Sequence, residues 1–105
     1  MLKGALSLLL LELLAGREDY GYSLVARLRG AGFADLTEGT VYPALSRLRG
    51  AGLLDSRLVR SSSGPARTYY VVTAAGESER RRGRVAWATL VDSVGRVLEP
   101  EGAEP

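Results

Sequence analysis

The side chains best suited to chemistry in this 105-residue chain are its arginines, which make up all of its basic residues except Lys3. Between Thr37 and Thr68, five arginines are accompanied by only two acids, which gives the segment a net charge of +3. These arginines are Arg47, Arg49, Arg57, Arg60 and Arg67. A guanidinium is a planar fork of donors that matches phosphate and the guanine edge, so this segment suits nucleic acid. A GC-rich genome that prefers Arg codons would give the same composition, and charge alone does not separate the two explanations.

The sequence contains neither histidine nor cysteine. The chain can therefore form no Ser-His-Asp or Cys-His nucleophile pair, no imidazole acid or base, no zinc finger and no disulfide. Glu12 and Glu38 could act as bases, but no paired acid or cluster of ligands accompanies them. We expect neither an enzyme nor a metal or cofactor site. A chain without disulfides also suits the reducing cytoplasm, where we expect it to act.

A first helix is expected over residues 2–15, with Gly16 ending it. An apolar run near the amino terminus looks superficially like a signal peptide, but Glu12 lies inside it. The run is also far shorter than the roughly 20 residues of a membrane span, so we expect no membrane partner. Leucines at helical spacing instead predict a stripe that faces a core. They are Leu6, Leu9, Leu10, Leu13 and Leu14. Leu8 and Leu11 lie off this stripe, which predicts a second packing partner.

Two more helices are expected before a change of pattern. Asp19 is a candidate N-cap for a short amphipathic helix that the glycines within residues 30–32 would end. Thr37 is a candidate N-cap for a third helix. The core positions of this third helix are Val41, Leu45 and Leu48. Pro43 lies inside it and removes a backbone donor, so the helix either starts later, near Thr40, or tolerates a bend.

A β-hairpin follows. Residues 54–60 alternate imperfectly between the two faces, residues 61–65 have turn chemistry, and residues 66–72 are the most strand-prone stretch of the chain. Tyr69 and Tyr70 point to opposite faces of their strand, so at least one belongs to the core. Three helices and a hairpin predict a mainly α fold with a small β-hairpin, a winged helix-turn-helix in which the third helix enters the major groove and the hairpin tip is the wing.

Thr73 is the candidate N-cap of a final helix, residues 74–98. Its first half is charged, with Glu77 and Arg81 as an i,i+4 pair, and we interpret residues 80–84 as a solvated face rather than a DNA-binding arm. Its second half has an apolar stripe that must fold back on the first helix or meet another chain. We therefore expect a winged helix-turn-helix domain over residues 1–73, a dimerisation helix over 74–98 and a flexible acidic tail over 99–105.

Five short motifs occur along the chain in a fixed order. They are LKGAL at 2–6, YGYSL at 20–24, EGTVYPAL at 38–45 followed by Arg47-Leu48, GLL at 52–54, and RTYY at 67–70 ahead of TAAG at 73–76. Together they resemble the PadR family of bacterial transcriptional regulators, and the length with a single final helix resembles its short subfamily. The resemblance implies a homodimer that binds a palindromic operator through its winged helices, usually as a repressor, and that in some members a small molecule releases.

The chain departs from the family pattern at two places. Tyr20 stands where histidine is common, and the tip at residues 61–65 has fewer basic residues than the wings of many members. Fewer basic residues imply fewer phosphate contacts and a weaker dependence on salt. With the total charge at only +2, an alternative is a winged-helix dimerisation or protein-interaction module that does not read DNA sequence.

The expected DNA contacts lie on the third helix and around the hairpin. On a helical wheel Tyr42, Ser46 and Arg49 share an outward face, with Arg47 beside it. Hydroxyl and apolar groups near the start of this helix could meet bases, and arginines could meet phosphate or guanine. The candidates are Tyr22, Thr40, Tyr42, Pro43, Ser46, Arg47, Arg49, Arg60, Ser63, Gly64 and Arg67. The alternative is that the tyrosines and Thr40 pack at the edge of the core and the arginines are merely solvated.

Trp87 is the only tryptophan and lies on the apolar stripe of the final helix. The candidate residues for a ligand site or dimer interface are Trp87, Leu90, Val91, Val94 and Leu98. In drug-responsive members of the family, a tryptophan at about this position lines a cavity between subunits and stacks on flat aromatic ligands. A small aromatic effector is therefore one interpretation, and a dimer anchor that binds no ligand is the other.

Overall fold

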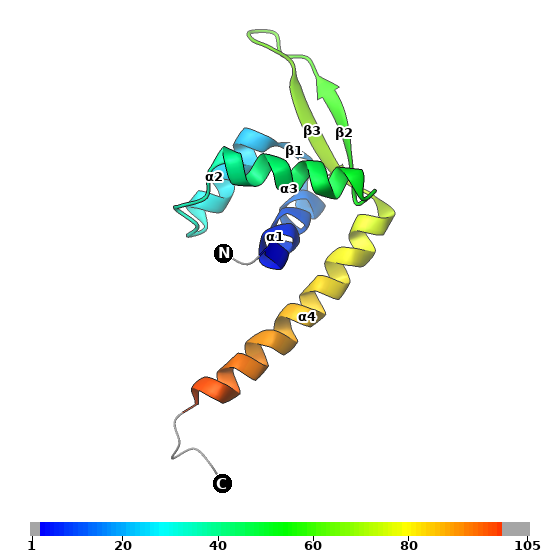
Figure 1. The fold of residues 1–105 in the computed structure, drawn as a ribbon. Coiled ribbons are helices and arrows are strands. Elements are labelled where there is room, and N and C mark those ends of the chain that lie inside the picture. Colours follow the sequence, from blue (N-terminus) through cyan, green and yellow to red (C-terminus); the bar gives the residue numbers. More distant parts are fainter. Residues whose placement is uncertain (1–2, 100–105) are drawn as a thin grey trace.

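The computed structural model describes residues 3–99, which form four helices and a three-stranded antiparallel sheet (Figure 1). The elements are α1 (Lys3–Gly16), β1 (Asp19–Tyr20), α2 (Gly21–Gly30), α3 (Glu38–Gly50), β2 (Leu54–Val59), β3 (Arg67–Val72) and α4 (Ala74–Leu98). The expected order of three helices, a hairpin and a long final helix is confirmed. Leu2 and the tail beyond Glu99 lie outside the described residues.

Helix α1 supplies much of the hydrophobic core, and Leu6, Leu10, Leu11 and Leu14 are all buried. The expected stripe is partly wrong, because Leu11 is buried while Leu9 and Leu13 only pack against the edge of the core. The reason is that α1 is covered from several directions, by α3, by β3 and by α4. The helix also includes Gly16, which was expected to end it.

The segment before α2 forms a strand, so the assignment of Asp19 as an N-cap is wrong. Asp19 pairs with Tyr70 of β3 and Tyr20 pairs with Tyr69, which adds a third strand to the expected hairpin in the order β1-β3-β2. The Asp19 side chain is buried and accepts hydrogen bonds from the Tyr20 amide at 2.9 Å, the Ser23 hydroxyl at 2.8 Å and the Arg27 guanidinium at 2.9 Å. This carboxylate therefore joins the strand to the side chains of α2.

Because of Asp19, the free energy of unfolding should change with pH in the acid range. Burial alone would raise the pKa of Asp19, but hydrogen bonds from Ser23, the Tyr20 amide and Arg27 outweigh burial and lower the pKa. Stability from this group is therefore present above the unfolded pKa of about 3.9 and is lost as the pH falls through the lower folded value. We expect Asp19→Asn to cost about 2 to 3 kcal/mol at pH 7 in urea unfolding. The difference from wild type should shrink below pH of about 4, and an unchanged difference at pH 3 would contradict this account.

Helix α3 begins directly after Thr37 and runs through Pro43. Thr37 occupies the N-cap position as expected, although its hydroxyl lies 3.5 Å from the Thr40 hydroxyl and makes no capping bond. Pro43 cannot donate to the carbonyl of Gly39, one turn earlier. Because Gly39 and Pro43 are both exposed, water can bind that carbonyl. Because water can bind the carbonyl that Pro43 leaves free, the helix tolerates the proline and starts at Glu38 rather than near Thr40.

Helix α4 packs against α1 along its first half. Gly83 lies against Leu8, and both Arg80 and Arg84 donate to the carboxylate of Glu12, Arg80 at 3.0 Å. Arg80 also pairs with Glu77, whose hydrogen bonds from Arg80 lower the pKa of that carboxyl. The expectation of a solvated face is therefore wrong for Arg80, whose side chain is only 18% exposed. The same ion pair gives a partner to the charge of Glu12, which lies inside an apolar helix. The second half of α4 extends away from the rest of the chain (Figure 1).

Candidate nucleic-acid interface

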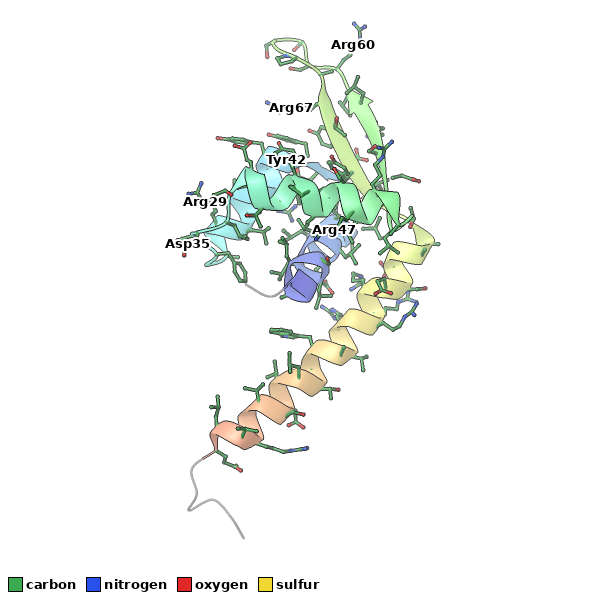
Figure 2. The ribbon with its side chains drawn as sticks, in the orientation of Figure 1. Arg29, Asp35, Tyr42, Arg47, Arg60 and Arg67 are labelled. Carbon is green, nitrogen blue, oxygen red and sulfur yellow. The ribbon has the colours of Figure 1, made fainter. Side chains whose placement is uncertain are left out.

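One long side of α3 is free of the core and lies next to the wing formed by β2, β3 and their connecting loop (Figure 2). Val41, Ala44, Leu45 and Leu48 are buried beneath the helix. All six of the residues predicted on α3 are exposed: Thr40, Tyr42, Pro43, Ser46, Arg47 and Arg49. The structure thus places these residues at the surface, as expected.

The exposed side of α3 has two edges. Tyr42 and Arg49 are seven residues apart and share the edge toward the wing, while Thr40 and Arg47, also seven apart, share the other edge. Figure 2 shows Tyr42 on the side of α3 from which the wing projects and Arg47 on the opposite side. A helix with donors on both edges can contact both walls of a DNA major groove.

Ion pairing divides the arginines into two groups. Within residues 3–99, eight arginines pair with a carboxylate: Arg17, Arg27, Arg57, Arg80, Arg81, Arg82, Arg84 and Arg96. The arginines outside these pairs are Arg29, Arg47, Arg49, Arg60 and Arg67. Arg29 donates to the Ala34 carbonyl at 3.3 Å, and the other four belong to α3 and the wing. These four guanidinium groups are available to phosphate.

The ring of Tyr42 packs over Gly21 at the start of α2. A Cβ atom at Gly21 would clash with the Tyr42 ring, so any other residue there would displace the ring from this position. Burial raises the pKa of Tyr42, with Glu38 and Tyr70 adding to the shift, and the hydroxyl therefore stays protonated as a donor. Tyr42 lines a groove of about 600 Å³ between α2 and the wing. The lining residues are Tyr20, Gly21, Tyr22, Tyr42, Ala66, Arg67, Thr68 and Tyr70.

A second groove, of about 700 Å³, lies between the carboxyl end of α3 and the inner face of the hairpin. Ser46 and Arg49 line it from α3, and Leu58 and Thr68 line it from the strands. Leu58 is an exposed apolar side chain at this position. Gly21, Leu58 and Thr68 were not predicted from sequence; the YGY motif at 20–22 was the available signal for Gly21, whereas the other two become visible only once the hairpin is placed beside α3.

The wing projects beyond α3, with Arg60 at its tip (Figure 2). Ser63 and Gly64 lie exposed in the loop, and the Ser63 amide donates to the Ser61 hydroxyl at 3.4 Å. Arg67 begins β3 and pairs with Val59 at the loop end of the two strands. Its guanidinium lies 4.4 Å from the centre of the Tyr20 ring, which in turn packs against Tyr69. A guanidinium held over an aromatic ring is oriented without losing its charge.

The expected apolar stripe of α4 is exposed within the single chain. Its members include Trp87 at 44%, Leu90 at 43%, Val94 at 45%, and the more exposed Val91 and Leu98. Beside it, an open cavity of about 770 Å³ lies between α1 and α4. Its lining residues are Ala5, Leu8, Leu9, Glu12, Phe33, Arg84 and Trp87. Phe33 belongs to the connector between α2 and α3, so the cavity lies against the helix-turn-helix as well as the final helix.

Among residues 3–99, no group of three or more acidic side chains is placed to hold a metal ion. No described helix is long and apolar enough to cross a membrane.

A family model described as the transcriptional regulator PadR-like family matches residues 10–82. Among solved structures, a PadR-like regulator from Bacillus cereus is 35% identical with a TM-score of 0.85, over 96% of this chain and 98% of that one. A PadR family regulator from Eggerthella lenta is 36% identical with a TM-score of 0.84, over 93% and 85%. A Streptococcus transcriptional regulator is 32% identical with a TM-score of 0.84, over 92% and 95%. No curated protein matches the chain.

Proposed function

The chain belongs to the PadR-like family of transcriptional regulators, and on this premise we propose that it is a homodimeric repressor that binds a pseudo-palindromic operator in the cytoplasm. Membership makes it a DNA-binding transcription regulator rather than an enzyme. This favours DNA binding over the alternative of an interaction module that does not read sequence.

The observation that carries this proposal is the placement of the unpaired arginines. Arg47 and Arg49 lie on α3, and Arg60 and Arg67 lie on the wing, while every other arginine of residues 3–99 except Arg29 is paired with a carboxylate. Guanidinium groups that position a protein on DNA do so by contacting phosphate. The free cations therefore coincide with the two elements that winged-helix proteins place against DNA.

The dimer is supported by the exposed stripe of α4. Leu90, Val91 and Val94 form a contiguous apolar surface on a helix that, beyond Trp87, has little of its own chain beside it. Such patches mark interfaces, and a second copy supplies an identical stripe under two-fold symmetry. We propose residues 1–73 as the DNA-binding unit, residues 74–98 as the dimerisation helix and residues 99–105 as a tail.

Operator binding is tested with gel shifts on the DNA upstream of the protein's own gene. The two α3 helices of a dimer would enter successive major grooves about 34 to 36 Å apart. A complex that weakens with added salt and that prefers this DNA over random duplex supports the proposal. Equal affinity for both duplexes would contradict the operator.

We further propose that a planar aromatic molecule bound in the cavity beside Trp87 releases the operator. The cavity is apolar apart from Glu12 and Arg84, and Trp87 offers a face for stacking. Because Trp87 is the only tryptophan, its fluorescence reports this site alone. We expect planar aromatic compounds to quench it at stoichiometric concentrations, whereas unchanged emission across a varied panel would leave Trp87 as a packing residue.

A further inference from the structure

A single side chain links the end of α3 to the start of α4. The Thr73 hydroxyl donates to the Gly52 carbonyl at 2.7 Å and accepts from the Gly76 amide at 3.0 Å. The Thr73 amide donates to the Leu53 carbonyl at 3.1 Å, and the Leu53 amide donates to the Leu48 carbonyl, within α3, at 2.9 Å. A continuous chain of hydrogen bonds thus leads from α3 through the turn at 52–53 into the first turn of α4.

Helix α4 also meets the turn that follows α3 closely at this point, backbone against backbone. Gly76 is buried, and a Cβ atom there would lie 2.1 Å from the Leu53 carbonyl oxygen and 2.8 Å from a methyl group of Val72. Gly52 has a φ of +79°, which favours glycine. No flexible side chain therefore lies between the turn and α4, and the junction has little room to bend.

From this geometry we infer that Thr73 is a positioning residue that makes α3 and α4 move as one rigid arm. The inference rests on the proposed dimer, in which the packing of the two α4 helices against each other would then set the separation of the two α3 helices. A molecule that shifts α4 from the cavity beside Trp87 would move α3 through the same contact. Such a path would carry the coupling between the cavity and the DNA-binding helix.

Three substitutions separate this role from simple helix capping. Thr73→Ser keeps the hydroxyl and both of its hydrogen bonds. Thr73→Asp keeps a good N-cap that accepts from the Gly76 amide, but at neutral pH it has no proton to donate to the Gly52 carbonyl. Thr73→Val loses both bonds at nearly the same volume. A residue that only capped α4 would tolerate aspartate, whereas a positioning residue would not.

The direct measurement is the distance between α3 and α4 within one chain. Because the chain has no cysteine, spin labels can be attached at Ser46→Cys on α3 and Thr89→Cys on α4, and the labelled chain can be diluted with unlabelled protein. Wild type and Thr73→Ser should give one narrow distance distribution, and Thr73→Asp and Thr73→Val should each give one at least twofold broader. One of these two variants is enough for the test, provided that it folds. A distance distribution as narrow as that of wild type in a folded variant would overturn the inference.

A second readout is the spacing of half-sites in the DNA that the protein selects from random duplexes. A loss of stability alone would not change this spacing. The unlabelled wild type and Thr73→Ser should enrich two half-sites at one spacing, while Thr73→Asp should enrich the same half-sites at several spacings. A single spacing for Thr73→Asp would overturn the inference. If wild type enriches no sequence, the proposed function fails, and the distance measurement still decides whether Thr73 positions the helices.

Discussion

Replacement of Val94 by glutamate is expected to separate the proposed dimer into monomers and to abolish operator binding. Val94 lies in the middle of the exposed stripe of α4. An ionised carboxylate placed in an apolar interface costs several kcal/mol, and two-fold symmetry introduces two of them. Since about 1.4 kcal/mol is a factor of ten, we expect the Kd of the dimer to rise on the order of 10³-fold or more, measured by sedimentation equilibrium.

The loss of operator binding follows from the loss of linkage between half-sites. A dimer bound at one half-site holds its second α3 at a high effective concentration near the other, a gain of about 10² to 10⁴ in affinity that a monomer lacks. Thr89→Glu is the matched control, because it adds the same charge to the opposite face of the same helix, where Thr89 is exposed. A Val94→Glu protein that remains dimeric would show that the stripe is not the interface.

Replacing Arg47 and Arg67 together by alanine is expected to lower operator affinity at least tenfold while the dimer stays intact. This is the second largest of the expected effects. Neither side chain has a carboxylate partner within residues 3–99, so the change leaves no buried charge behind. A dimer loses four guanidinium groups. If each contacts one phosphate, the plot of log K against log salt becomes shallower by about 3.6. Fluorescence anisotropy of a labelled operator over a range of salt measures both quantities.

Arg81→Ala with Arg82→Ala is the control for this prediction. These two arginines are exposed on α4, away from α3 and the wing. Replacing them removes the same number of positive charges per dimer. The control should keep nearly the wild-type salt dependence. Equal losses in the two double variants would mean that DNA responds to net charge alone, and α3 and the wing would not be its specific contacts.

The elements with local signals were predictable from the sequence. All core positions of α3 carry apolar residues, so its repeat is easy to detect. Thr73 is the N-cap of α4, as expected. The turn chemistry of residues 61–65 separates β2 from β3. At least one of Tyr69 and Tyr70 was expected in the core, and Tyr70 is buried there. These features depend on neighbours within a few residues of one another, which periodicity and turn preferences can detect.

The features that were missed depend on residues far apart in the chain. β1 has two residues, too few for any alternation, and it exists because β3 offers a free edge. The carboxylate of Asp19 has the right chemistry for an N-cap but binds Arg27 instead. Glu12 and Arg80 are 68 positions apart, so nothing local indicated their pairing. The exposure of the predicted DNA contacts could be foreseen, whereas the room that Gly21 leaves for Tyr42 could not.

Operator recognition is tested most directly by selecting bound sequences from random duplex DNA with the wild-type protein and mapping contacts on the enriched site. The account predicts a two-fold symmetric sequence whose half-sites are about 10 to 10.5 base pairs apart from centre to centre, with α3 protecting the major groove of each. Enrichment of no sequence, or of a single site without symmetry, would contradict the account.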